Sequence, residues 1–439
     1  MEIQSYREVV DRILSIPKFT KEKHGFEVIR SYLEALGHPE RGIQVIHVAG
    51  TNGKGSVTRM LAGLLEKTGK RTGAFYSPHL VRMNERIQVN AREISDEALV
   101  SVFRAVEEVR EERHFPQLTF FELLFVMAMV HFHEEQVDCV VLETGLGGRL
   151  DATTSIPAEL YVITQVGLDH EEYLGHTIPE VAGEKAGIIT GSSPVVWNSG
   201  SEEADRVIRD RIERMGASPA VNAGNARIRD LRISPSGIDF SIKTDYYSYD
   251  LLHLDTLAVY QVDNAATVIC AAELLLQELR EKDPQGFIRL IREMLQDFRW
   301  EGRLTEVRPG LWLDGAHNPS AATRLAESVK ELQKLHSGER LGWRLVYGAS
   351  ADKNMEETLR QLATVHWDEL WLVPYTGARS AAKEELEFLG EKVMGETVKI
   401  TAFPEVSSML KRLKEEEGHT CTIVAGSLYL VGEIRGSIK

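Results

Sequence analysis

The residue types that bind phosphate occur together in one glycine-rich segment, Gly50-Thr51-Asn52-Gly53-Lys54-Gly55-Ser56. Glycines allow backbone N–H groups to turn towards phosphate oxygens, because no Cβ atom stands in the way. A lysine amine can neutralise the terminal phosphates, and the start of a following helix adds the positive end of its dipole. We call residues 50–56 the phosphate loop and predict that it binds ATP or a closely related nucleotide.

The phosphate loop departs from the usual P-loop pattern at two points. Gly50 and Gly53 are closer together than usual, and Gly55 separates Lys54 from the hydroxyl of Ser56. Counting along the loop therefore does not assign a magnesium-binding hydroxyl, and a plain glycine-rich turn with a solvated lysine is the alternative. The flanking segments favour a phosphate site, since residues 45–49 read as a buried strand and residues 56–67 as a helix.

Two other apolar runs end in side chains that could bind a metal. Glu143 follows residues 139–142, and Asp169-His170 follow residues 160–166. Carboxyl ends of parallel strands meet at one edge of a sheet, so we expect the phosphate loop, Ser77, Glu143 and His170 at that edge. Hard cations prefer carboxylate oxygens beside phosphates, which makes Glu143 a candidate magnesium ligand. A salt-bridged glutamate and a structural histidine are the alternatives.

Lys185 lies among small and apolar residues and has two interpretations. The stem can pack while the amine stays solvated, and spacing alone favours this interpretation. A desolvated amine would have a lowered pKa, and only the neutral amine can attack carbon dioxide to form a carbamate.

In the second half of the chain, spacing alone does not decide the function of the candidate residues in three segments. Asp314 and His317 follow a short apolar run, where a ligand-binding loop is expected, and Arg303 could clamp a phosphate. Each could equally be an ordinary turn or surface residue. Asn264 begins a helix and could be a cap or an adenine contact.

Composition excludes several classes of protein. The chain has 439 residues, and 51 basic against 66 acidic side chains give a net charge of −15, which argues against nucleic-acid binding. Three widely spaced cysteines in apolar stretches predict free core thiols in a reducing compartment. The first residues carry charges throughout, unlike a signal peptide, and no apolar run has the length of a membrane helix. We expect a cytoplasmic protein with no membrane partner.

Alternating strands and helices predict an α/β protein of two domains. Residues 1–298 form a P-loop-containing domain with a mainly parallel sheet, and residues 299–439 form a smaller Rossmann-like α/β domain. Short alternating segments at about 226–252 predict a small antiparallel side sheet, with strands at 228–233, 238–242 and 246–252. Helices are expected near 262–281 and 287–295, and further strands at 311–313, 344–347, 370–373, 398–400 and 422–424.

Taken together, these motifs resemble those of folylpolyglutamate synthase, often bifunctional with dihydrofolate synthase, in the Mur ligase superfamily. Matching stretches run along nearly the whole chain: the phosphate loop and residues 77–80, 85–87, 119–122, 143–151, 169–170, 174–177, 184–188, 314–319 and 426–430. The segment Glu301-Gly302-Arg303 departs from the family, which usually has proline before the glycine, but it retains Arg303.

The resemblance implies a role for each candidate residue. ATP would contact the phosphate loop (Gly50, Thr51, Asn52, Gly53, Lys54, Gly55 and Ser56) together with Asn264, Arg303 and Asp314. One magnesium would bind Ser77 and Glu143, and a second would bind His170 and a carbamylated Lys185. Lys54, Lys185 and His317 would be catalytic. Folate would lie along Thr119, Phe120, Phe121, Glu122, Leu150, Asp151 and Ala152.

The implied reaction is ATP-dependent formation of an amide between a folate carboxylate and L-glutamate. Its ligands are small molecules and Mg²⁺, with a monovalent cation as a further candidate, and we expect the chain to act as a monomer. The resemblance leaves open whether dihydropteroate, folate or both accept glutamate. A Mur-type ligase for another carboxylate and a nucleotide-gated binding protein are the alternative functions.

Overall fold

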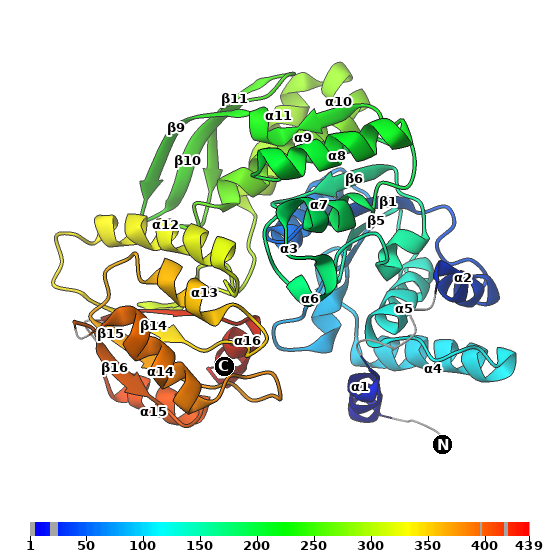
Figure 1. Cartoon of the computed structure of the whole chain (residues 1–439). Coiled ribbons are helices and arrows are strands. Elements are labelled where there is room, and N and C mark those ends of the chain that lie inside the picture. The colour runs from blue at the N-terminus through cyan, green and yellow to red at the C-terminus, as the bar shows by residue number, and fades with distance from the viewer. Residues whose placement is uncertain (1–4, 18–24, 396, 417–419, 439) are drawn as a thin grey trace.

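The computed structural model describes residues 5–17, 25–395, 397–416 and 420–438. Two α/β units lie side by side, each with its own sheet, and a small antiparallel sheet lies beside the first unit (Figure 1). This arrangement confirms the predicted fold class. Within the described residues, no helix is both long and apolar enough to span a membrane.

The first sheet has eight strands in the order β4-β3-β2-β5-β1-β6-β7-β8. Its central strand β1 (Gln44–Ala49) runs parallel to β5 (Cys139–Glu143) and β6 (Leu160–Ile163), so the ends of these strands lie at one edge. The other strands are β2 (Thr72–Phe75), β3 (Ile87–Val89), β4 (Arg92–Glu93), β7 (Val195–Trp197) and β8 (Ala220–Asn222). Only β3 and β4 are antiparallel to their neighbours.

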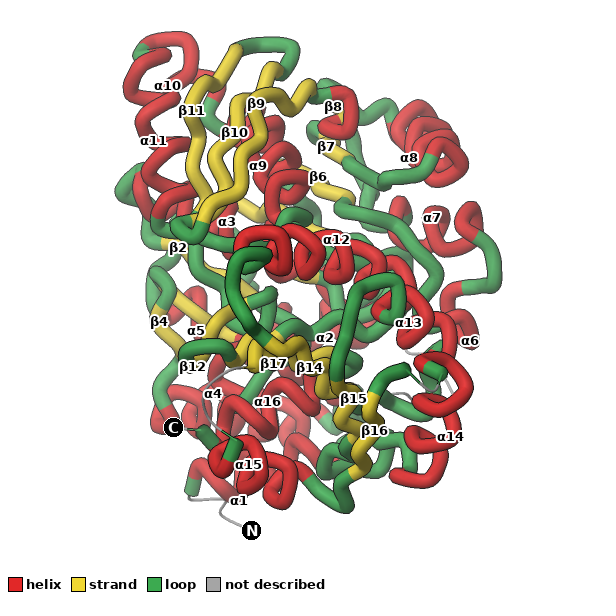
Figure 2. The backbone as a smooth tube through the Cα atoms, turned by 90° about the vertical axis from the view of Figure 1, so that its left-hand side faces the viewer, coloured by secondary structure: helices red, strands yellow, loops and turns green. Residues whose placement is uncertain are grey.

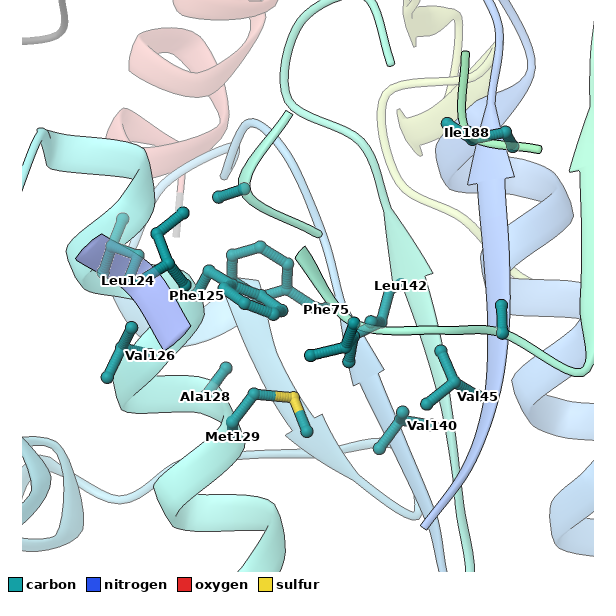
Figure 3. Packing of buried hydrophobic residues seen from close by; sticks show 14 of the residues in the cluster. Val45, Phe75, Leu124, Phe125, Val126, Ala128, Met129, Val140, Leu142 and Ile188 are labelled. Carbon is teal, nitrogen blue, oxygen red and sulfur yellow. The ribbon is translucent and has the colours of Figure 1, made fainter. Parts of the chain in front are cut away.

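Helices cover both faces of this sheet because its central strands are apolar on both sides. In β1, Val45 and Ala49 join the core on one face, whereas Ile46 and Val48 join the core on the other. Figure 3 shows part of the first of these cores, with Val45 beside Val140 and Leu142 of β5. The first face carries α1 (Tyr6–Ser15), α2 (Phe26–Ala35), α4 (Asp96–Arg113), α5 (Phe120–Glu134), α7 (Ile178–Ala186) and α8 (Glu202–Met215). The second carries α3 (Lys54–Lys67), α9 (Gln261–Leu275) and α11 (Pro284–Gln296), while the short α6 (Glu171–Leu174) follows β6.

The three-stranded sheet contains β9 (Arg227–Ser234), β10 (Gly237–Lys243) and β11 (Ser248–Leu254), all antiparallel, as predicted. The prediction of one helix over 262–281 is wrong. Leu276 has non-helical angles (φ −113°, ψ 33°) and separates α9 from α10 (Gln277–Lys282). The sequence has neither glycine nor proline at this point, which is why its pattern predicts a continuous helix.

The second sheet has the order β12-β13-β17-β14-β15-β16, and only β12 is antiparallel. Its strands are β12 (Thr305–Arg308), β13 (Leu311–Leu313), β14 (Gly342–Tyr347), β15 (Glu369–Leu372), β16 (Lys399–Ala402) and β17 (Thr420–Ala425). Figure 2 shows α12 (Pro319–Leu335) and α13 (Met355–Leu362) on one side, where α14 (Lys383–Met394) joins the same core, and α15 (Val406–Glu415) and α16 (Leu428–Ser437) on the other. The five strands predicted here are present, whereas the division at 298/299 stays a prediction.

We predict that Gly73→Ala destabilises the first unit. A Cβ atom on this residue of β2 would lie 2.8 Å from the ring of Phe132 and 2.9 Å from Val140. Overpacking of this kind lowers the free energy of unfolding by about 1–3 kcal/mol, which a urea-unfolding midpoint will detect. Gly63→Ala is the matched control: its Cβ meets only Arg59, at 3.9 Å, so helix propensity should make it neutral or stabilising. Equal midpoints for the two variants would contradict the packing described.

Candidate functional site

A cavity of about 360 Å³ lies between the first sheet and the second unit. Its walls contain every residue predicted to bind ATP or metal or to act in catalysis: Gly50, Thr51, Asn52, Gly53, Lys54, Gly55, Ser56, Ser77, Glu143, His170, Lys185, Asn264, Arg303, Asp314 and His317. Residues from strand ends that are far apart in sequence therefore meet in one place, as predicted. The role of each residue stays a prediction.

The phosphate loop connects β1 to α3 and is shaped by a close approach to α9. Gly53 has a left-handed conformation (φ 87°), and a Cβ atom there would lie only 2.4 Å from Oδ1 of Asn264. The Asn264 amide donates to Gln261 (2.8 Å), whose own amide donates to Oγ of Ser56 (3.1 Å). Asn264 is not the cap of α9, because Tyr260 occupies that position. Its side chain instead lies against the phosphate loop in the cavity wall.

Two lysine amines donate to the same backbone carbonyl in the loop. Nζ of Lys54 lies 3.1 Å and Nζ of Lys185 lies 2.8 Å from the Gly50 oxygen. Burial, reinforced by the charge of Lys54, lowers the pKa of Lys185 to about 7. Burial also lowers the pKa of Lys54, although Glu143 acts in the opposite direction. The interpretation of Lys185 as a solvated amine is therefore wrong, since its position inside the cavity wall removes it from water.

Glu143 is a buried carboxylate at the end of β5. Burial raises its pKa to about 7, against the effect of Lys54, and the Ser77 N–H donates to Oε2 at 2.9 Å. No lysine, arginine or histidine among the described residues forms an ion pair with it. A divalent cation would supply the missing positive charge, so Glu143 fits a metal site. Among these residues, however, no group of three His, Cys, Asp or Glu side chains is arranged to hold a metal by itself.

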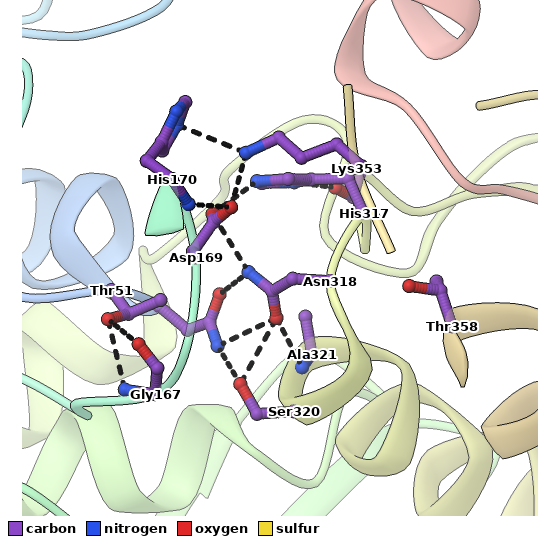
Figure 4. A network of polar contacts seen from close by, with 12 residues as sticks. Thr51, Gly167, Asp169, His170, His317, Asn318, Ser320, Ala321, Lys353 and Thr358 are labelled. Atoms are coloured by element: carbon purple, nitrogen blue, oxygen red, sulfur yellow. Dashed lines mark hydrogen bonds and ion pairs between the residues drawn. The ribbon is translucent and has the colours of Figure 1, made fainter. Parts of the chain in front are cut away.

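A polar network joins the two units across the cavity (Figure 4). Asp169 accepts from Asn318 (3.2 Å), lies 3.3 Å from Nε2 of His317 and forms an ion pair with Lys353. Burial would raise the pKa of Asp169, but the hydrogen bond and charge of His317, with Lys353, hold it well below its usual range. Burial lowers the pKa of His170 to about 4, so this imidazole is neutral at physiological pH.

The second unit contributes further groups to the same wall. Nη1 of Arg303 donates to the Gly302 carbonyl at 2.9 Å, and Asp314 accepts from the Tyr260 hydroxyl at 2.6 Å. Burial raises the pKa of Asp314, which the Tyr260 hydrogen bond opposes. Both units are thus needed to enclose the cavity.

Models of two protein families cover most of the chain. The Mur ligase middle domain matches residues 48–272, and the C-terminal domain of dihydrofolate synthetase matches residues 303–437. The chain is 34% identical over 425 residues to the dihydrofolate synthase/folylpolyglutamate synthase of Bacillus subtilis strain 168, covering 95% of each sequence. This chain belongs to the dihydrofolate synthase/folylpolyglutamate synthase family.

Solved structures of the family have the same fold over nearly the whole chain. Escherichia coli FolC in complex with DHPP and ADP has a TM-score of 0.84 at 27% identity, covering 99% of this chain and 98% of that one. Folylpolyglutamate synthase of Thermotoga maritima has a TM-score of 0.81 at 30% identity, with 98% and 96% covered. The family consists of ligases that join an acid to an amino acid.

The residues that the family resemblance assigns to folate do not line the cavity. Thr119 and Glu122 form a reciprocal cap at the start of α5, and Phe120 and Phe121 follow them. Leu150 is exposed, and Ala152 is buried. Of the residues assigned to folate, Phe121 and Asp151 contact the loop at 145–147 that forms one cavity wall.

Asp151 holds the loop at 145–147 in place through hydrogen bonds to its backbone. Its carboxylate accepts from the Gly145 and Leu146 N–H groups (2.9 and 3.0 Å) and from the hydroxyl of Thr153 (2.6 Å). Thr153 in turn lies 2.5 Å from Nε2 of His47, a buried residue of β1. Asp151, one of the residues assigned to folate, is thus linked by hydrogen bonds through Thr153 to His47 of β1, the strand that precedes the phosphate loop.

We predict that His47 makes the ligase less stable as the pH falls. Burial lowers its pKa to about 3, whereas the unfolded side chain titrates near 6.5. The unfolded state therefore binds more protons between these values, so His47 lowers the free energy of unfolding by about 2 kcal/mol at pH 5 relative to pH 7.5. Urea unfolding at the two pH values should show this loss, and it should be smaller in His47→Gln. The exposed His133→Gln is the control; if it matches His47→Gln, the assignment fails.

Proposed function

We propose that this chain is an ATP-dependent amide ligase that adds L-glutamate to a folate carboxylate. The observation that carries the proposal is the single cavity in which the phosphate loop of the first unit faces Arg303, Asp314 and His317 of the second. Such a site can hold a triphosphate with its terminal phosphate between the two units. Relatives named as dihydrofolate and folylpolyglutamate synthases support the choice of substrate.

In the proposed mechanism, an oxygen of the folate carboxylate attacks the γ-phosphorus, and the bond from phosphorus to the β-bridging oxygen breaks. The products of this step are an acyl phosphate and ADP. The glutamate amine then attacks the acyl carbon, loses a proton and expels phosphate. Lys54 and Arg303 would stabilise charge on the transferring group, since positioning and electrostatics dominate phosphoryl transfer. The second unit would exclude water, which otherwise hydrolyses the acyl phosphate.

Magnesium, when bound, would neutralise charge on the nucleotide phosphates. Glu143 with Ser77 would hold one ion, and His170 with a carbamylated Lys185 would hold a second. The neutral imidazole of His170 and the buried carboxylate of Glu143 have the donor chemistry for this role. Related structures contain ADP, AMPPCP, or AMPPNP with manganese. We further propose that the enzyme also uses a monovalent cation. We also propose that it acts as a monomer whose ligands are small molecules alone.

An assay with ATP and glutamate, offering dihydropteroate and reduced folate separately, tests the function and identifies the acceptor. Amide formation with either, together with ADP and phosphate, is the expected result. Turnover only with a muramyl or other carboxylate would indicate a Mur-type ligase instead. ATP hydrolysis that does not depend on glutamate, with no new amide by mass spectrometry, would indicate a nucleotide-gated binding protein.

We predict that Lys54→Ala abolishes glutamate-dependent ADP release, because it removes the cation nearest the expected terminal phosphates. The measurement is ADP release with saturating folate substrate and glutamate. Lys67→Ala is the matched control, since this lysine ends the same helix and pairs with Asp297 outside the cavity. Full activity in Lys54→Ala would refute the assignment of the phosphate loop.

We predict a carbamate on Lys185. A pKa of about 7 leaves much of this amine neutral at physiological pH, and the neutral fraction, which alone reacts with carbon dioxide, rises with pH. Carbon-13 NMR of enzyme equilibrated with labelled bicarbonate should show a carbamate signal that is stronger at pH 8 than at pH 6. The signal should be missing from Lys185→Ala. A spectrum of the unaltered enzyme without it would exclude the modification.

A further inference from the structure

Trp300 connects the phosphate loop to the segment that carries Arg303. Its indole packs on Tyr76 with ring centroids 4.7 Å apart. A Cβ atom on Gly55 would lie 3.3 Å from Nε1 of Trp300 and 3.5 Å from its Cζ2, so the edge of the indole lies directly over the first turn of α3. This contact gives a physical reason for the glycine between Lys54 and Ser56.

Both neighbours of the indole adjoin proposed ligands. Gly55 is flanked by Lys54 and Ser56 of the phosphate loop, and Tyr76 precedes Ser77, whose N–H donates to Glu143 at 2.9 Å. A Cβ atom on Gly55 would also lie 3.5 Å from Oε2 of Glu143. The indole therefore packs where the phosphate loop and the proposed magnesium ligands come together.

The segment that carries Trp300 is fixed to the second unit as well. Glu301 forms a two-point ion pair with Arg435 of α16, with both N···O distances 2.9 Å. The Gly302 carbonyl accepts from the Gly315 N–H at 2.8 Å, beside the loop that carries His317. Three residues beyond the indole, Arg303 lines the cavity.

We propose that Trp300 is a positioning residue, whose packing over Gly55 holds the phosphate loop and Arg303 in the relative positions that ATP binding requires. The proposal rests on the proposed function, because it assigns Trp300 a role in binding the nucleotide of that reaction. Trp300 does not line the cavity, so it acts through Gly55, Tyr76 and Arg303 rather than by contact with substrate. Loss of the indole should weaken ATP binding and leave the site for glutamate unaffected.

The test is a double-mutant cycle of Gly55→Ala, Trp300→Ala and the double variant in the full-length enzyme. The readouts are KM for ATP, KM for glutamate, kcat and the thermal midpoint. Trp300→Ala should raise KM for ATP by about tenfold, within the range of coupling between contacting residues, with little change in KM for glutamate. Gly55→Ala should raise KM for ATP at least about threefold more beside Trp300 than in the Trp300→Ala background, where the added methyl group meets no indole.

Two further variants keep the outcome decisive. Trp300→Phe retains a ring against Tyr76 but removes the edge that faces Gly55, and it replaces Trp300→Ala if that variant does not fold. Trp312→Phe controls for loss of a half-buried tryptophan of β13 that does not line the cavity, and it should leave KM for ATP unchanged.

Equal fold changes for Gly55→Ala in the two backgrounds, including no change in either, would overturn the proposal. A fall in thermal midpoint and kcat with KM for ATP unchanged would also overturn it, because that result indicates a structural role alone. If the unaltered enzyme forms no amide, the proposed function fails. The same cycle is then measured as the Kd of ADP with magnesium by calorimetry, where loss of coupling would separately overturn the role of Trp300.

Discussion

Two lysine ammonium groups around one carbonyl oxygen are the constraint on which the site depends. Lys54 and Lys185 both donate to Gly50, and two positive charges around one oxygen atom repel each other. An anion between them, or loss of one charge, relieves this repulsion. A bound triphosphate would be such an anion, and a neutral or carbamylated Lys185 would remove one of the two positive charges. The electrostatics of the loop thus favour both nucleotide binding and a modified lysine.

The fold places Lys54 and Lys185 at the edge of the first sheet, and the second unit covers the cavity at that edge. β1 lies between β5 and β6, so Gly50 begins a loop that faces two other strand ends. Asp169, just beyond β6, contacts His317 and Lys353 of the second unit. A ligase with a water-sensitive intermediate needs such an enclosure, because each unit alone would leave the reacting atoms in solvent.

The periodicity of apolar residues along the sequence predicted those strands and helices whose burial is decided by neighbouring residues. The buried strand before Gly50, the helix after it and the gathering of strand ends all followed from apolar periodicity. β7 and β8, with three residues each, were not predicted. Spacing could not show that Lys185 faces the cavity, since either side of its short helix could be buried. Lys353 lies 184 positions from Asp169, and only the packing of the two units reveals that contact.

The central claim is that ATP activates a carboxylate as an acyl phosphate in this cavity, and an oxygen label tests it most directly. The substrate is the folate acceptor with ¹⁸O in both oxygens of the reacting carboxylate, incubated with enzyme, magnesium, ATP and glutamate. The account predicts that each molecule of amide formed is accompanied by one phosphate containing a single ¹⁸O atom, read by mass spectrometry. Amide formation with unlabelled phosphate, or with the label in AMP, would contradict it.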